Sequence, residues 1–378
     1  MTDDRENPQF TTIDLFAGCG GMTQGFVNKG FRPTLAVEWD LAAAATYAAN
    51  FGADHVFWGD IADLPDAQVP EADIVIGGPP CQGFSNLGTR DPNDPRNMLW
   101  REYVRVVCLA RPKVFVIENV DRFRSSHEFR LLVEEVDSGA LQDYSIEVAI
   151  LNAANFGVPQ RRKRTIVVGS RIGRPELPVA SHSQVGIGER GWKTVRDAFV
   201  GVPYDTTTVD LSHSRVEFFG QEVPGTFKAA DLHLGRNPKP LSLRRYDSIP
   251  PGGGRFDLPD DLMPVCWRNK LSGTTDVMGR MRWEAPSLTI RTEFFKPEKG
   301  QYLHPQWSKE SSAHRVNRPI THWEAARLQG FPDDYSWCGK KIEIARQIGN
   351  AVPVGLAEAV ARSVHDQLVA PLPMLAGT

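Results

Sequence analysis

Short apolar runs recur through the first 170 residues of this 378-residue chain, and patterns of helical spacing lie between several of them. The runs are rich in valine, isoleucine and phenylalanine and are too short for core helices, which is typical of strands buried on both faces of a sheet. This rhythm predicts an α/β fold: a doubly wound, mostly parallel sheet with helices on both faces. The expected strands are 12–16, 34–37, 55–58, 73–76, 114–117, 145–151 and 165–169, and the expected helices are 21–29, 42–50, 96–109 and 128–136.

The regular pattern stops near residue 172. Residues 176–285 are rich in proline, glycine and short polar runs, including a Pro-Pro-Gly-Gly-Gly stretch at 250–254, and hold few periodic segments. This composition predicts a second, smaller and irregular domain with short strands. Helical patterns return at 322–328 and 354–368, and we find no internal repeat.

The charge of the chain is unevenly distributed, although the net charge is only −3. Residues 1–150 hold 12 basic and 23 acidic side chains, residues 151–330 hold 27 and 18, and residues 331–378 hold 4 and 5. A polyanion would be attracted to the middle segment. The alternative is that these charges are an ordinary solvated surface.

Other features of the composition narrow the functional classes. The acidic N-terminus lacks the pattern of a signal peptide, and no apolar run approaches the length of a membrane span. The five cysteines are odd in number and scattered, without a Cys-x-x-Cys pair, which argues against a disulfide framework and against a cysteine-based zinc site. We therefore expect no metal and a cytoplasmic location.

One cysteine directly follows an expected strand. The apolar run 74–76 leads into Gly-Gly-Pro-Pro, and Cys81 comes next. Functional groups of open α/β sheets lie at the carboxyl ends of the strands, and the prolines restrict where the thiol can point. Cys81 is therefore a candidate nucleophile. From these residues alone, an equally good interpretation is a small buried hydrophobe.

A glycine-rich turn follows the first expected strand and opens a helix, where backbone amides commonly meet a cofactor. Its Gly-x-Gly-Gly spacing at 18–21 differs from the dinucleotide fingerprint, so NAD, FAD and S-adenosylmethionine all stay open. Glu38, about 20 residues further on, is placed to accept hydrogen bonds from ribose hydroxyls. Trp39 would cover one face of an adenine, and Asp60 would accept from its amine. The alternative for Glu38 and Asp60 is an ordinary loop cap.

Several motifs follow one another in a specific order: Asp14–Gly21, Glu38-Trp39-Asp40, Gly59-Asp60-Ile61, Pro80-Cys81-Gln82, Glu118-Asn119-Val120, Gln160–Arg164, Arg327–Pro332 and Gln347–Pro353. By this ordered set the chain resembles the cytosine-C5 DNA methyltransferases. Each string is weak by itself, but the set is specific. The resemblance covers residues 12–170 and 286–357 and leaves the middle of the chain unmatched.

The resemblance implies S-adenosylmethionine as the cofactor. It places cofactor contacts at Phe16, Ala17, Gly18, Gly20, Gly21, Glu38, Trp39, Asp60, Ile61, Pro80, Asn350 and Val352. It also implies a catalytic set of Cys81, Glu118, Arg162 and Arg164. In that set Cys81 attacks C6 of cytosine, Glu118 supplies the proton or hydrogen bond at N3, and Arg162 and Arg164 hold the base. Because alternate strand residues share a face, the two arginines are expected to point the same way.

The implied substrate is a flipped cytosine in a specific double-stranded DNA sequence, since a stacked base hides C6. Residues 1–175 and 341–378 would form the catalytic domain, residues 176–330 the target-recognition domain and residues 331–340 a hinge. Residues 85–101 look like a loop able to close over DNA. Eight arginines would contact phosphates or guanines: Arg215, Arg236, Arg244, Arg245, Arg255, Arg268, Arg280 and Arg282.

Two alternatives stay open at this point. One is a transfer RNA cytosine-C5 methyltransferase of the same fold, although that branch usually continues its nucleophile motif with proline and threonine where this chain has Gly83 and Ser85. The other is a catalytically silent, S-adenosylmethionine-dependent DNA-binding module, which would have no chemical need for Cys81, Glu118 and Arg164 together. We also expect a monomer on DNA, a nucleoid-associated location, no membrane contact and a cognate restriction endonuclease as a partner.

Overall fold

The computed structural model describes residues 10–80, 99–186, 190–268 and 275–370. The chain divides into two compact units. Unit 1 comprises Met1–Phe156, Lys163–Ser181 and Val352–Thr378, and unit 2 comprises Gly157–Arg162 and His182–Ala351. No helix within the described ranges is both long enough and apolar enough to cross a membrane.

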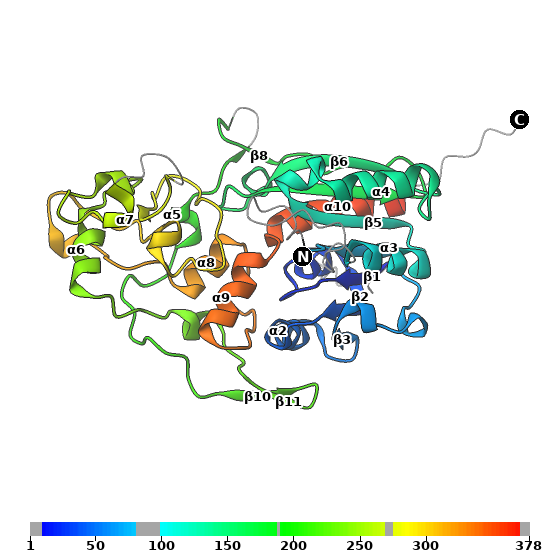
Figure 1. The fold of residues 1–378 in the computed structure, drawn as a ribbon, viewed down its shortest axis with the longest axis horizontal. Helices are drawn as coiled ribbons and strands as arrows, with labels where there is room; N and C mark the ends of the chain where they lie inside the picture. Colours follow the sequence, from blue (N-terminus) through cyan, green and yellow to red (C-terminus); the bar gives the residue numbers. More distant parts are fainter. Residues whose placement is uncertain (1–9, 81–98, 187–189, 269–274, 371–378) are drawn as a thin grey trace, which may run out of the picture. The chain divides into compact units, whose positions relative to one another are not determined.

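Unit 1 is built on a seven-stranded sheet with the order β3-β2-β1-β4-β5-β7-β6 (Figure 1). The first five strands in this order are parallel, and β7 runs antiparallel to both of its neighbours. This arrangement confirms the predicted doubly wound, mostly parallel fold. The strands are β1 Phe10–Leu15, β2 Phe31–Glu38, β3 Val56–Trp58, β4 Ile74–Gly77, β5 Val114–Val120, β6 Ser145–Asn152 and β7 Lys163–Ser170; the helices are α1 Gly21–Val27, α2 Leu41–Phe51, α3 Leu99–Ala110, α4 His127–Ser138 and α10 Val354–Val369.

The continuous apolar runs are explained by burial on both faces of the sheet. Val75 and Phe115 belong to a core cluster with residues of α3 and α4 on one face. Ile76 and Val116, their neighbours along the strands, belong to a second cluster with residues of α1 and α10 on the other. Since side chains alternate along a strand, both sets must be apolar.

The last helix of the chain completes unit 1. Helix α10 packs against α1 so closely that a Cβ atom on Gly25 would lie 2.5 Å from the Cβ of Ala357. Only glycine allows this approach of the two backbones. The segment that follows the glycine-rich turn is thus held by a helix more than 300 residues further along the chain.

The strand order changes direction at β1, which pairs in parallel with β2 on one side and with β4 on the other. Leu15 ends β1 opposite Val37 and Gly77. A Cβ on Gly77 would lie 2.6 Å from the Leu15 carbonyl oxygen, so this pairing needs a glycine. The carboxyl ends of strands at such a switch point form the usual ligand crevice of an open α/β sheet.

Unit 2 is irregular, as the composition of residues 176–285 predicts. Its described strands are two to four residues long and form three separate two-stranded sheets. The elements are β8 His182–Ser183, β9 Arg190–Gly191, β10 Arg215–Phe218, β11 Gln221–Pro224, β12 Gly279–Arg280, β13 Gln301–Leu303, α5 Val195–Ala198, α6 Pro240–Ser248, α7 Val265–Arg268, α8 His322–Leu328 and α9 Lys341–Asn350.

A fully buried arginine holds unit 2 together. The guanidinium of Arg280 donates five hydrogen bonds of 2.6–2.9 Å, and their acceptors come from three stretches of chain. The acceptors are the carbonyl oxygens of Tyr246, Ile249, His304 and Val316 and the Oδ1 of Asn317. Burial lowers the pKa of Arg280 to about 9, which still leaves it charged at neutral pH. All five N–H donors of the side chain are used internally, so the expectation that Arg280 contacts DNA is wrong.

Arg280→Lys should destabilise the protein by about 3 kcal/mol, because an ammonium group has three donors and cannot replace the planar five-donor fork. Urea unfolding followed by tryptophan fluorescence measures the difference. Arg282→Ala, two residues away at an exposed position, is the matched control and should stay within about 0.5 kcal/mol of wild type. Equal stabilities of the two variants would contradict the role of Arg280.

Candidate active site

The loop after β1 has a strained, open backbone. Phe16, expected as the last strand residue, lies outside β1 with a φ of 59°, and Gly18 and Gly20 have φ values of 55° and 86°. The Ala17 amide donates to the Val37 carbonyl at 3.0 Å, which anchors the loop to β2. A Cβ on Gly18 would meet no atom within 4 Å, so this side of the loop is open among the described residues. Gly21 then begins helix α1.

Glu38 closes this loop from the end of β2. Its Oε2 accepts from the Gly18 amide and its Oε1 from the Asp40 amide, each at 2.8 Å. The side chain is buried, and this burial raises the pKa of Glu38 above its usual value. Each carboxylate oxygen has a second lone pair for a further donor. Glu38 is thus a positioned hydrogen-bond acceptor at the switch point.

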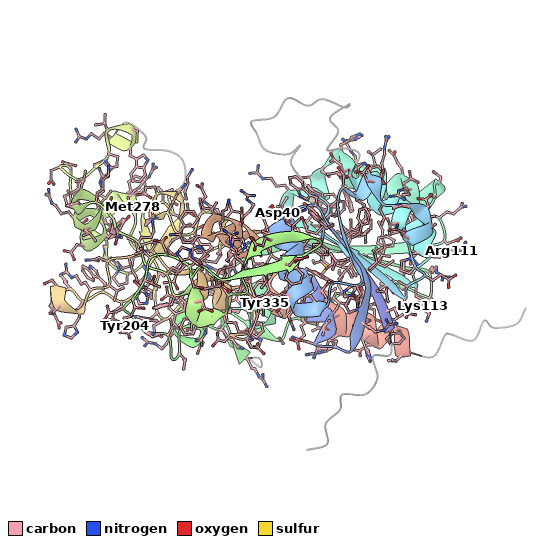
Figure 2. The ribbon with its side chains drawn as sticks, turned by 90° about the horizontal axis from the view of Figure 1, so that it is seen from below. Asp40, Arg111, Lys113, Tyr204, Met278 and Tyr335 are labelled. Atoms are coloured by element: carbon pink, nitrogen blue, oxygen red, sulfur yellow. The ribbon has the colours of Figure 1, made fainter. Side chains whose placement is uncertain are left out.

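The other expected cofactor residues of unit 1 lie beyond the ends of β2 and β3. Trp39 is 76% exposed, although large apolar rings are usually covered. Asp60 is exposed and accepts from the Ala62 amide at 3.0 Å, which caps a 3-10 helix, whereas Ile61 is buried in the core. Figure 2 shows Asp40, after β2, at one end of the strands and Lys113, before β5, at the other.

A buried polar network lies beneath the glycine-rich loop. The Thr23 hydroxyl donates to Asp14 Oδ2 at 2.6 Å, and the Tyr47 hydroxyl lies 3.1 Å from the same threonine oxygen. Burial raises the pKa of Asp14 to about 7, and the nearby charge of Glu38 adds to the effect. Burial also raises the pKa of the Cys19 thiol to about 12, which keeps it protonated and unreactive.

An acid and an arginine meet beside the segment that leads to Cys81. Glu118 Oε1 lies 2.8 Å from Arg164 Nε, and both side chains are largely buried. The other carboxylate oxygen, Oε2, would lie 3.3 Å from a Cβ on Gly78. This ion pair forms because β7 is antiparallel to β5, so Arg164, at the start of β7, lies opposite Val120 at the end of β5.

The backbone just before Cys81 is held by Asn119. The Asn119 side-chain amide donates to the Pro79 carbonyl at 2.9 Å, and its oxygen accepts from the Val120 amide at 2.9 Å. Pro80 is exposed at the end of this segment. Cys81 itself and most of the expected loop at 85–101 lie outside the described residues.

The remaining expected residues lie in different places. Arg162 precedes β7 and belongs to unit 2, where it donates to the carbonyl oxygens of Ile290 at 2.8 Å and Gly349 at 3.0 Å. Alternation along a strand predicts that Arg162 and Arg164 share a face. The structure differs, because β7 begins at Lys163 and Arg162 lies outside the strand. Asn350 is an exposed residue of unit 2, and Val352 packs against the α1–α10 cluster of unit 1.

Two glutamines link three motifs in unit 2. Gln160 Nε2 donates to Gln329 Oε1 at 2.7 Å and to the Leu328 carbonyl at 3.1 Å, and Gln329 Nε2 donates to the Ile348 carbonyl at 2.5 Å. Both glutamines are fully buried. Sequence reasoning missed these residues and Asn119, although each lies inside a motif. The one sequence feature that could have indicated them is a neutral polar residue within or beside an apolar run, which needs a hydrogen-bond partner when it is buried.

No group of three or more histidine, cysteine, aspartate or glutamate side chains among the described residues is arranged to hold a metal ion.

Comparison with known proteins gives consistent results. The model of the C-5 cytosine-specific DNA methylase family matches residues 10–366. The Type II methyltransferase M1.HphI of Haemophilus parahaemolyticus is 34% identical over 364 residues, which cover 94% of this chain and 86% of that protein. The Type II methyltransferase M.DdeI of Desulfomicrobium norvegicum is 31% identical over 376 residues, covering 93% of this chain and 88% of that protein.

Solved structures show the same fold. A protein described as a DNA modification methyltransferase encoded within an E. coli prophage superposes with a TM-score of 0.69 at 24% identity, over 96% of this chain and 100% of the other. The Entamoeba histolytica methyltransferase EhMeth superposes with a TM-score of 0.64 at 16% identity, over 96% and 99% of the two chains.

Asp14→Asn should remove a pH-dependent loss of stability. Because the pKa of Asp14 is raised from 3.8 to about 7 in the folded protein, its contribution to stability is fully present below pH 4 and is lost as the pH rises through 7. The loss is on the order of 4 kcal/mol at most. Urea unfolding at pH 5 and pH 8 should show the variant gaining stability relative to wild type at the higher pH.

The exposed Asp143→Asn is the matched control, and its stability relative to wild type should barely change between the two pH values. The same flat difference for Asp14→Asn would contradict the raised pKa.

Proposed function

Because the chain belongs to the family of C-5 cytosine-specific DNA methylases, we propose that it methylates a flipped cytosine at C5 in a specific duplex DNA sequence, through a covalent bond from Cys81 to C6. The observation that carries the proposal is the position of Glu118. One of its oxygens is paired with Arg164 and the other faces Gly78, three residues before Cys81. An acid and a nucleophile on one substrate base need such proximity.

The proposed reaction begins with proton supply at the base. Glu118 donates a proton or a hydrogen bond to N3 of cytosine, which makes C6 electrophilic enough for the Cys81 thiolate to attack. The new S–C6 bond gives C5 the electron density to take a methyl group. Loss of the C5 proton to solvent then breaks the S–C6 bond and expels the thiolate, and N3 returns its proton to Glu118, which leaves neutral 5-methylcytosine.

Arg164 has a positioning role in this scheme. Its guanidinium holds Oε1 of Glu118, so that Oε2 is the oxygen directed toward the nucleophile segment. Asn119 fixes the Pro79 carbonyl and thereby limits where the following two residues can go. Arg162 was expected to hold the base. Its hydrogen bonds to the carbonyl oxygens of Ile290 and Gly349 support an indirect role, in which Arg162 positions the backbone of unit 2.

The residues at the switch point fit S-adenosylmethionine, which supplies the methyl group when it is bound. The open space beside Gly18 would let a ligand lie directly against the backbone of the loop. The carboxylate of Glu38 is held by two amides and has lone pairs left to accept from two ribose hydroxyls. The exposed ring of Trp39 would cover the adenine. Phe16, Ala17, Gly20, Gly21, Asp60, Ile61, Pro80, Asn350 and Val352 complete the proposed contacts.

We assign target recognition to residues 176–330 and catalysis to residues 1–175 and 341–378, with residues 331–340 as a hinge. The excess of basic over acidic side chains in residues 151–330 supports this assignment, because DNA is a polyanion. Helix α9 packs within unit 2. We assign it to the catalytic part because it contains the start of the Gln347–Pro353 motif, although its contacts are with unit 2.

The partner is double-stranded DNA, and the enzyme acts on it as a monomer in the cytoplasm. Relatives named Type II methyltransferases support a cognate restriction endonuclease as a second partner. Incubation with labelled S-adenosylmethionine and either duplex DNA or transfer RNA tests the substrate class. Label in DNA alone supports the proposal, label in transfer RNA alone overturns it, and bisulfite sequencing of host DNA then identifies the site.

Cys81→Ser should abolish methyl transfer and leave cofactor binding near that of wild type, because the thiol bonds to the base. The wild type should also form a denaturation-resistant adduct with DNA containing 5-fluorocytosine, whose C5 substituent cannot leave as a proton. Gel electrophoresis after denaturation detects the adduct. Cys108→Ser, at an exposed free cysteine, is the control and should keep full activity. An active Cys81→Ser enzyme would exclude the covalent route.

Glu38→Ala should weaken S-adenosylmethionine binding by about 1.5–3 kcal/mol, the scale of lost hydrogen bonds to a charged acceptor. Glu118→Gln should instead lower turnover and keep the affinity for the cofactor. Calorimetric titration of both variants, together with single-turnover rates, separates the two roles. The assignment fails if Glu118→Gln loses the cofactor while Glu38→Ala keeps it.

A further inference from the structure

The eight arginines expected to contact DNA differ in what they contact within the protein. Six are already engaged: Arg280 and Arg255 are buried, Arg236 donates to the Phe295 carbonyl, Arg244 pairs with Asp261 at 3.0 Å, Arg245 donates to the Leu262 carbonyl at 2.8 Å, and Arg268 lies 3.4 Å from the carbonyl oxygens of Met263 and Asp260. The side chains of Arg215 and Arg282 are exposed, and neither forms a hydrogen bond, ion pair or ring contact with the residues that the structure describes.

The surroundings of these two arginines are different. Arg215 lies on the hairpin of β10 and β11, where Glu217, two residues further along the same face, is opposite Glu222. Two carboxylates beside Arg215 weaken its attraction for a polyanion. The nearest carboxylate in sequence to Arg282 is Glu284, whose charge is paired with Arg196. Arg282 is therefore the better candidate for a DNA contact.

The guanidinium of Arg282 lies directly on the backbone of Gly252. A Cβ atom on Gly252 would be 1.8 Å from Arg282 Nε and 2.5 Å from its Cζ, which no side chain could tolerate without moving the arginine. Gly252 also has a φ of 78°, a conformation that favours glycine. The glycine therefore provides a flat surface on which the arginine rests.

This surface is rigidly held. The Gly252 amide donates to the Arg280 carbonyl at 2.9 Å, and the Arg280 amide donates to the Gly253 carbonyl at 3.1 Å. Arg280 is the buried centre of unit 2, and Met281, next to it, is buried and bonded through its amide to the Leu303 carbonyl at 3.0 Å. Met278 marks this segment in Figure 2. The backbone before Arg282 and the loop beneath its side chain are thus parts of one hydrogen-bonded core.

The guanidinium of Arg282 uses none of its five donors on the described residues, so its planar fork is available to a base edge. Guanine presents O6 and N7 in the major groove, and an arginine reads both by two parallel hydrogen bonds whose directions must match. The backbone on both sides of this contact, next to Arg282 and at Gly252, is held by hydrogen bonds, so the arginine projects from a fixed position. A phosphate makes smaller demands on orientation, and a lysine serves there as a point charge.

We propose that Arg282, resting on Gly252, reads a guanine of the recognition sequence; this rests on the proposed function of the chain as a DNA cytosine methyltransferase. The guanine O6 and N7 accept from the guanidinium, and the other base pairs at that position lack this pair of acceptors.

The test compares Arg282→Ala and Arg282→Lys with wild type, by methylation of a randomised duplex library followed by bisulfite sequencing. Both variants should lose preference for guanine at one position, by roughly 5- to 150-fold, and keep preferences elsewhere. Arg362→Ala, at an exposed arginine of α10 whose partner Glu358 lies 3.8 Å away, is the matched control and should keep every preference.

Gly252→Ala offers a second, independent test because it displaces the arginine without replacing it. It should relax the same position as Arg282→Ala. Gly201→Ala is its control, since Gly201 has a similar φ of 75° but no atom within 4 Å of the added Cβ. Backbone strain alone would therefore affect both glycine variants, whereas loss of base reading should appear only in Gly252→Ala.

Different results overturn different claims. If Arg282→Ala weakens methylation of all sequences alike, lowers the salt dependence of binding by about one charge and is rescued by lysine, Arg282 contacts a phosphate and the proposal is wrong. Unchanged preferences in both Arg282 variants overturn it as well. If wild type methylates no duplex DNA, the proposed function itself has failed.

Discussion

The parallel pairing of β1 with both β2 and β4 is the constraint on which the candidate site depends. Because these strands are parallel, β1 and β4 end at the same end of the sheet, and the glycine-rich loop and the segment leading to Cys81 both begin there. Hydrogen bonds from Gly18 to Glu38 and from Asn119 to Pro79 then fasten these loops to the ends of β2 and β5. The strand order thus places the glycine-rich loop, Glu38 and Glu118 at the same end of the sheet.

The reversed direction of β7 brings the positive charge of Arg164 to the same end of the sheet as Glu118. A parallel strand would have placed its first residues at the opposite end of the sheet. Because β7 is antiparallel to β5, Arg164 near its beginning reaches Glu118 near the end of β5. The ion pair is largely shielded from water, so both partners depend on each other for compensation of their buried charge. One antiparallel strand in an otherwise parallel region therefore has a direct consequence for the chemistry.

Unit 2 relies on buried polar side chains where unit 1 relies on apolar strands. Its strands are too short to satisfy the backbone by sheet pairing alone, and Arg280, Gln160 and Gln329 take up carbonyl groups from distant segments. A second buried pair, Arg318 with Glu324, is hydrogen-bonded twice at 2.8 Å within the same unit. Burial is costly for such groups unless every donor finds an acceptor, and this requirement selects one arrangement of the loops.

Part of this protein could be predicted from its sequence, because the information was local. The alternation of short apolar runs with helical patterns predicts the doubly wound sheet, since burial on both faces demands consecutive apolar residues such as Ile74 to Ile76. The ordered motifs likewise indicate the family, and Glu38 lies at the carboxyl end of its strand as expected.

The tertiary structure alone decided how the polar residues are used. Gln160 and Gln329 are 169 residues apart, and no local pattern shows that one donates to the other. Arg280 and Arg282 are two residues apart and chemically identical, yet one is completely enclosed and the other is exposed on Gly252. Charge and residue type are properties of the sequence, but desolvation and hydrogen-bond partners depend on which distant segments fold around a side chain.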